Sequence, residues 1–134
     1  MNPADATDKT GAAVTIRLED SSPIGAYTVD LGGGAPVGRA EFLDAPDGQR
    51  ERIFFHTEVD DGFTGRGLAG LLLREALADS VRRKLTVVPV CPLFARHLKS
   101  HGEAFEAAGG AFRRPNRADL ALVARTARVR RDGT

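Results

Sequence analysis

The chain has 134 residues, 42% of them hydrophobic and 28% charged, with a formal net charge of +1 at pH 7. These values are typical of one globular domain that buries a core without disulfides or a structural metal. Its one cysteine, Cys91, excludes an internal disulfide framework and fits a reducing cytoplasm. The sequence has no signal-peptide pattern and no run of 18 apolar residues, so neither secretion nor a membrane span is expected.

The first half of the chain predicts an antiparallel meander. Residues 1–13 are small, polar and unpatterned, and we expect a disordered lead-in there. The segments 14–18, 26–31, 37–43 and 52–59 have the residue composition of strands and are joined by short connections with turn chemistry. Short connections between successive strands favour antiparallel pairing.

A glycine-rich turn follows the last of these strands. Gly65, Gly67 and Gly70 stand where a helix with an i, i+3, i+4 apolar stripe begins, and this helix is expected to run from Gly67 to about Lys84. Uncovered amides at a helix start form an anion site, so a phosphorylated cofactor is one interpretation and a plain strand-to-helix connection is the other. A dinucleotide fold is excluded because no acidic residue follows about 20 positions later, and no P-loop motif is present.

The second half predicts a strand, a helix and a final strand. Residues 85–90 form a continuous apolar run, which is typical of a strand buried on both faces and parallel to 52–59. Cys91-Pro92 opens a helix that Gly102 is expected to break. Residues 119–125 are predicted to form a last strand, so the domain spans 14–125 and a basic tail covers 126–134, with residues 128–134 expected to be frayed.

Charge divides the chain at the glycine turn. Residues 1–62 carry twelve acids and five bases, whereas residues 63–134 carry six acids and fourteen bases. The basic half would attract an anionic ligand and the acidic half a cationic amine, although the same division also arises from solvated surfaces. Sixteen of the nineteen basic residues are arginine, which indicates a GC-rich bacterial coding bias. The three histidines and the cysteine have no metal-ligand spacing, so no metal is expected.

Four ordered motifs give the chain a family resemblance. They are His56-Thr57-Glu58-Val59, Gly65-Arg66-Gly67-Leu68-Ala69, Val87-Val88-Pro89-Val90-Cys91-Pro92 and His101-Gly102-Glu103. Over roughly residues 24–108 this pattern resembles the GNAT superfamily of N-acetyltransferases, and in particular its compact single-domain subgroup with a cysteine after the splayed strand. Thr64 stands where the superfamily has Arg or Gln, Gly102 replaces the subgroup's proline, and His97 replaces a helical tyrosine.

The resemblance implies an α/β (α+β) fold with a mixed sheet, in which an antiparallel meander is followed by a strand, a helix and a splayed parallel strand. It implies acetyl-CoA as cofactor, with the pyrophosphate on the amides of residues 65–70 and the pantetheine arm beside the main chain of Thr57 and Val59, whose amide could polarise the thioester. Arg66 could add a charge-assisted contact or be a surface arginine. The candidate cofactor residues are Thr57, Val59, Gly65, Arg66, Gly67, Leu68, Ala69 and Gly70.

Three side chains are candidates for catalysis. Cys91 at a helix N-cap could be a covalent nucleophile, a base or a tuning residue, and its alternative is a buried filler. Glu58 is a candidate general base for the amine, or else a solvated strand carboxylate. His97 takes the place of the tyrosine that reprotonates the CoA thiolate in the wider superfamily, but a histidine is more often structural.

Three functions follow from these residues. The first is acetyl-CoA-dependent transfer of acetyl to an unidentified amine. The second is a CoA-binding module with little or no turnover, acting as a sensor or scaffold. The third, nucleic-acid binding through the arginine-rich C-terminal segment, is disfavoured because no aromatic residues alternate with the arginines to stack on bases.

Overall fold

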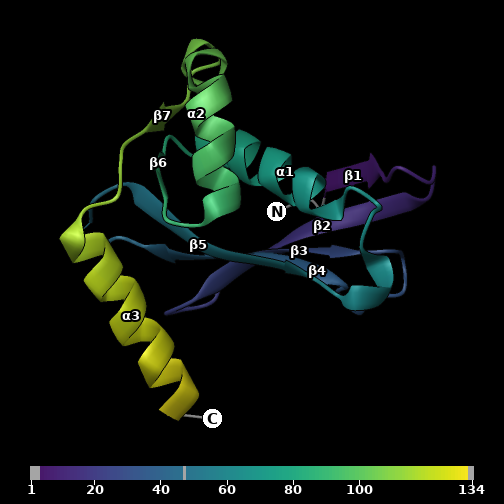
Figure 1. The fold of residues 1–134 in the computed structure, drawn as a ribbon, viewed down its shortest axis with the longest axis horizontal. Coiled ribbons are helices and arrows are strands. Elements are labelled where there is room, and N and C mark those ends of the chain that lie inside the picture. The colour runs from purple at the N-terminus through teal and green to yellow at the C-terminus, as the bar shows by residue number, and fades with distance from the viewer. Residues whose placement is uncertain (1–3, 47, 133–134) are drawn as a thin grey trace.

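The computed structural model describes residues 4–46 and 48–132. Seven strands form one sheet in sequential order, and three α-helices and a short 3-10 helix accompany it (Figure 1). The strands are β1 Ala4–Thr7, β2 Ala13–Glu19, β3 Gly25–Asp30, β4 Gly38–Asp44, β5 Glu51–Val59, β6 Thr86–Pro89 and β7 Ala111–Phe112. The helices are η1 Asp61–Phe63, α1 Leu68–Arg82, α2 Pro92–Ala107 and α3 Arg117–Asp132. None of the described helices is long and apolar enough to cross a membrane.

The predicted meander is confirmed, with one strand more than expected. β2, β3, β4 and β5 pair in antiparallel succession within one or two residues of the predicted segments. The lead-in was predicted to be disordered, but in its described part β1 pairs antiparallel with β2, with Ala4 opposite Ile16. This short strand was missed because its alternating apolar side chains are only alanines and because Ala and Asp are depleted in strands, so it depends on its pairing with β2. Residues 1–3 of the lead-in lie outside the described residues.

The parallel part of the sheet follows the predicted order. β6 pairs parallel with residues 51–54 of β5, and β7 pairs parallel with β6. α1 connects β5 to β6, as expected for a crossover between parallel strands. The register of β5 with β6 ends at Phe54 and Pro89, so the second half of β5 has no parallel neighbour among the described residues. The two strands are therefore splayed.

A β-bulge lies where the splay begins. Phe42 faces Phe54 across β4 and β5, but Glu41 faces His56, so Phe55 is an extra residue in β5. A bulge interrupts the alternation of faces along a strand. Thr57 therefore points to the same face of the sheet as Phe54.

Two apolar clusters cover the two faces of the sheet. One lies under α1 and α2, where the rings of Phe54 and Phe94 stack with centroids 4.5 Å apart. The other is built around Ile53 and Val88 and is covered by Leu122 of α3. Figure 1 shows α1 and α2 on one side of the sheet and α3, in yellow, on the other. β6 is thus buried on both faces, as its apolar run predicted.

The C-terminal prediction was wrong: residues 119–125 form part of α3 and not a strand. The helix begins with a reciprocal cap, in which the Asn116 side chain accepts from the Asp119 amide at 3.0 Å and Asp119 accepts from the Asn116 amide at 2.7 Å. Such a cap stabilises a helix start, so the segment is helical despite its apolar run. The tail predicted to be frayed is helical through residue 132, and residues 133–134 lie outside the described part.

Arg113 attaches α3 to the sheet. Arg113 forms paired hydrogen bonds to Glu51 of β5 and to Asp119 of α3, at 2.8–2.9 Å, and so joins this helix to the sheet.

Gly102 was expected to break the second helix, but α2 is continuous through it. A Cβ at Gly102 would lie 2.6 Å from the ring of Phe112, so this glycine permits β7 to pack closely on α2.

Candidate functional site

The glycine turn has the geometry of an open helix start. Gly65 and Gly67 have φ angles of 81° and 78°, in the left-handed region that favours glycine, and Gly67 is the N-cap of α1. No side chain of the described residues caps this helix, and its first turn contains no acidic residue. The main-chain amides of its first residues therefore form the positive end of the helix dipole, and no side-chain acceptor competes with a ligand for them.

A pocket of about 280 Å³ lies beside this turn. It is lined by Val59, Phe63, Thr64, Gly65, Gly67, Leu68 and Ala69. Five of the eight candidate cofactor residues therefore line one pocket. Arg66 and Gly70 are not among its lining residues, and Thr57 lies farther back along β5.

Arg66 has a partner that the sequence did not reveal. Its Nε donates to Oδ2 of Asp8 at 2.7 Å, and the Asp8 side chain is fully buried. The hydroxyl of Thr10 is the largest influence that lowers the pKa of Asp8, to about 2, and Arg66 acts in the same direction. Asp8 is therefore ionised near neutral pH and holds the guanidinium of Arg66 against the turn between β1 and β2.

The splay between β5 and β6 leaves a free main-chain edge. The amides of Val90 and Cys91 both donate to the carbonyl of Phe54, at 2.9 and 2.8 Å, and end the parallel ladder. The Asp60 amide donates to Val37 on the β4 side, at 2.7 Å. Because main-chain groups alternate along a strand, the amides of Thr57 and Val59 point to the other edge, where β6 has departed.

Cys91 lies at the base of this splay. It is the N-cap of α2 and is buried, with 4% of its surface exposed. Its sulfur lies 3.5 Å from Oγ1 of Thr57, within hydrogen-bonding distance for a thiol. The structure thus brings together two of the candidate residues from segments 34 positions apart.

Glu58 lies on the opposite face of the sheet from Cys91. Thr57 faces Cys91, so the next side chain along β5 points away from it. The Glu58 side chain is 58% exposed, and its Oε2 lies 3.8 Å from Nε2 of His56. The thiol and the carboxylate therefore approach β5 from two sides and form no common cluster.

His97 lies on α2 and stacks on His101, with ring centroids 4.7 Å apart. Burial lowers the pKa of His97 from its usual 6.5, and the charges of His101 and Arg74 lower it further. His97 is therefore neutral at pH 7 and carries one ring N–H. Arg74 comes from α1 and His101 from α2, so charges on both helices act on this histidine.

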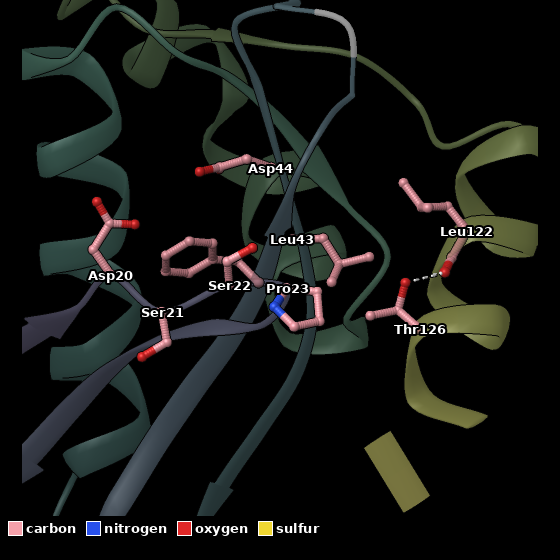
Figure 2. A pocket seen from close by; sticks show the side chains of 9 residues that line it. Asp20, Ser21, Ser22, Pro23, Leu43, Asp44, Leu122 and Thr126 are labelled. Carbon is pink, nitrogen blue, oxygen red and sulfur yellow. Dashed lines mark hydrogen bonds between the residues drawn. The ribbon is translucent and has the colours of Figure 1, made fainter. Parts of the chain in front are cut away.

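Another pocket, of about 230 Å³, lies between the β2–β3 connection, the end of β4 and α3 (Figure 2). Its lining residues are Asp20, Ser21, Ser22, Pro23, Phe42, Leu43, Asp44, Leu122 and Thr126. The Thr126 hydroxyl donates to the Leu122 carbonyl at 2.7 Å, the dashed line in Figure 2, and is used within its own helix. Asp44 is paired with Arg52 at 2.7 Å. This pocket lies apart from the glycine turn and contains none of the candidate site residues.

Sequence reasoning missed the contribution of the β1–β2 turn. Asp8 and Lys9 were assigned to a disordered lead-in, but the Lys9 amide donates to the Arg66 carbonyl at 3.0 Å. The available signal was Asp8-Lys-Thr10-Gly11, a combination typical of a tight turn in which an aspartate binds its own following amides. Its pairing with Arg66 has no local signature.

Comparisons with known proteins found one family model and a similar solved structure. The model of a family described as GCN5-related N-acetyl-transferase matches residues 26–107, more than half of the chain. A crystal structure of ribosomal-protein-alanine N-acetyltransferase from Brucella melitensis biovar Abortus 2308 is similar, with 22% identity and a TM-score of 0.46, over 69% of this chain and 67% of that one. No curated protein matches the chain.

Proposed function

Because the chain belongs to the GCN5-related N-acetyltransferase family, we propose that it transfers acetyl from acetyl-CoA to an amine acceptor. The observation that carries this proposal is the free edge of β5 beside an uncapped glycine helix start. The free edge of β5 can pair with an extended ligand arm that carries amide groups, and the helix start can bind a phosphate. Their adjacency favours a ligand that has both.

The residues at the glycine turn fit the phosphate end of such a ligand. A Cβ at Gly65 would meet no atom within 4 Å, so the space over this residue is open. The amides of residues 65–70 would hold the pyrophosphate, and the α1 dipole would favour its charge. Val59 lines the same pocket and connects it to the edge of β5.

The main chain of Thr57 and Val59 would bind the pantetheine arm as an added strand. Bound acetyl-CoA supplies the activated thioester. The Val59 amide is the donor that would polarise the thioester carbonyl, because an N–H fixed by a sheet needs no reorganisation during the reaction. The bulge at Phe55 supports this role, since it puts the amides of Thr57 and Val59, and not those of His56 and Glu58, on the free edge.

Glu58 is the proposed base for the incoming amine. Its side chain is exposed on the face of β5 away from Cys91, where an acceptor has access. Its carboxylate would orient the ammonium and accept its proton. Cys91 would assist from the other face through its contact with Thr57, and we favour direct transfer over a covalent acetyl-cysteine. Because His97 is neutral at pH 7, it would donate a hydrogen bond through its ring N–H and would not act as a protonated general acid.

A panel of amines and peptides tests the proposal, with acceptor-dependent release of free CoA as the measurement. Transfer predicts release with at least one acceptor and its loss in Glu58→Gln. Glu106→Gln, on the exposed side of α2, is the matched control and should retain the rate. A chain that binds CoA, as judged from a rise in melting temperature, but releases none would be a binding module instead. A melting temperature unchanged by saturating CoA would contradict both functions.

A further inference from the structure

We propose that the turn between β1 and β2 completes the cofactor site, and that Lys9 supplies the cation that contacts the pyrophosphate of CoA. In this arrangement Arg66, the basic residue within the glycine motif, is a positioning residue. The inference rests on the proposed function and adds to it a residue from the far N-terminal part of the chain.

Lys9 lies directly against the glycine turn. Its amide donates to the carbonyl of Arg66 at 3.0 Å, which fixes its backbone beside the residue before the N-cap. Its side-chain carbons Cγ, Cδ and Cε lie 3.1–3.3 Å from the position that a Cβ would occupy on Gly67. Lys9 itself is exposed. The lysine stem therefore crosses the helix start, and its ammonium group remains accessible to a ligand there.

Asp8 makes this turn rigid. Its buried carboxylate accepts from the Thr10 amide at 2.8 Å, the Thr10 hydroxyl at 2.6 Å and the Ala12 amide at 3.0 Å. The fourth donor is the Nε of Arg66. The aspartate thus fixes both the conformation of its own turn and the position of the turn against the glycine motif. A lysine placed in this way loses little conformational freedom when it binds an anion.

The charges assign the two cations different roles. The guanidinium of Arg66 faces a full negative charge on Asp8 at 2.7 Å and lies over the ring of Phe63, 5.5 Å from its centroid. No acidic side chain occupies the first turn of α1, and no partner is described for the Lys9 ammonium that would neutralise it at this helix start. A lysine binds phosphate as a point charge, which suits the mobile oxygens of a pyrophosphate.

The glycine at position 67 is consistent with this arrangement. A side chain there would strain the backbone and push the stem of Lys9 aside by a few tenths of an ångström. The glycine thus lets the lysine stem lie closely against the helix start. This links the two parts of the proposed phosphate site in the folded chain before a ligand arrives.

Affinities of Lys9→Met for three probes test the proposal by isothermal titration calorimetry. CoA carries the pyrophosphate and the 3′-phosphate, 3′-dephospho-CoA carries only the pyrophosphate, and pantetheine carries neither. We expect Lys9→Met to weaken CoA and 3′-dephospho-CoA by about tenfold each, the usual size of one charged contact, and to leave pantetheine unchanged. Lys9→Arg should restore most of the affinity. Lys99→Met, an exposed lysine of α2, is the matched control and should bind like the parent.

Other results would overturn the inference. Equal affinities of Lys9→Met and the parent for CoA would remove Lys9 from the site. Tighter binding of CoA to Lys9→Met would mean that the lysine side chain blocks the access of CoA to the glycine turn. A loss confined to CoA would place the contact on the 3′-phosphate instead of the pyrophosphate. If the parent itself bound no CoA, the proposed function would fail, and this outcome is distinct from the other three.

Asp8→Asn tests the positioning role separately. It should lower the melting temperature and also weaken CoA binding, whereas a purely structural role would lower only the former. A double-mutant cycle distinguishes the two, because Asp8→Asn/Lys9→Met should bind CoA no more weakly than the weaker single variant if both act through one contact. Fully additive losses would show that Asp8 does not act through Lys9.

Discussion

The sulfur of Cys91 lies 3.5 Å from the hydroxyl oxygen of Thr57, and this contact bridges β5 and the start of α2 where the sheet splays. Both residues lie on the face of the sheet covered by α1 and α2. The opposite face presents Glu58 to solvent. The proposed site therefore has a buried side, formed by the thiol and hydroxyl, and an open side, formed by the carboxylate.

This arrangement predicts a partial role for Cys91. We expect Cys91→Ala to reduce acetyl transfer several-fold without abolishing it, and the parent to show no added mass when incubated with acetyl-CoA alone. Intact-mass spectrometry checks the second point, because a covalent route would leave about 42 Da on the protein. Thr57→Val, which removes the hydroxyl with little change of shape, should reproduce the effect of Cys91→Ala.

Two outcomes would contradict this prediction. A stoichiometric acetyl group on Cys91 that moves onto an added amine would establish the covalent route. Full activity in Cys91→Ala would remove the residue from the mechanism.

The two glycines at the start of α1 should respond differently to substitution. Gly67 has a left-handed backbone, so Gly67→Ala should cost about 1–2 kcal/mol of stability. Gly70 is within α1, and a Cβ there would meet only the Arg74 side chain at 3.7 Å. Gly70→Ala should therefore stabilise the fold by up to about 1 kcal/mol. Chemical denaturation measures both.

Gly70 also separates binding from folding. We expect Gly70→Val to fold but to lose CoA binding, because a branched side chain would crowd the amides of the first helical turn. Gly70→Ala is the control for the stability of the helix. Parent-like CoA affinity in Gly70→Val would exclude this position from the phosphate site.

The lowered pKa of His97 predicts a pH dependence of stability. Below pH 6.5 the histidine in the unfolded chain becomes protonated, while the native one stays neutral until the pH reaches its lower pKa. The unfolded state then binds more protons, so stability falls as the pH falls below 6.5. Melting temperatures between pH 5.5 and 7.5 should show a smaller decrease in His97→Gln than in the parent.

His101→Gln gives a second reading of the same group. Its charge is one cause of the lowered pKa of His97, so removing it should raise that pKa, as measured by NMR titration of the ring protons. Arg74→Gln should act in the same direction. A pKa of His97 that stays constant in both variants would leave burial as the sole cause.

The docking of α3 should depend on Arg113. Its hydrogen bonds to Glu51 and Asp119 are the charged link between this helix and β5, so Arg113→Ala should make α3 more susceptible to trypsin. Asn116→Ala removes the cap and should cost about 1 kcal/mol. Arg114→Ala, an exposed neighbour, is the control and should be cleaved like the parent. Equal cleavage of Arg113→Ala and Arg114→Ala would contradict this role.

The central part of the fold was predictable because its signals are local. The apolar stripe of α1, the continuous apolar run of β6 and the proline after Cys91 each specify an element without reference to distant residues. The same is true of Gly65 and Gly67, whose backbone conformation follows from the turn they form. These features and the four motifs were sufficient to indicate the family.

The remaining features depend on contacts between distant segments. The bond from Arg66 to Asp8 joins residues 58 positions apart, and β1 exists only because it pairs with β2. The helix α3 was mistaken for a strand because a short apolar run does not distinguish the two, and the cap that starts it is a reciprocal contact of Asn116 and Asp119 in the folded chain. Gly102 was interpreted as a break because its neighbour, Phe112, is close only in the folded chain.

The bulge at Phe55 determines which length changes β5 can tolerate in evolution. Loss of this one residue would leave a regular strand with Thr57 and Glu58 still on their present faces. Loss of residue 57, or gain of one between 57 and 58, would instead turn Glu58 to the other face and bury its carboxylate beside the core. Relatives that differ in the length of this strand should therefore place the gap at position 55, and an alignment that moves it two residues later would assign the proposed base, Glu58, to the wrong side of the sheet.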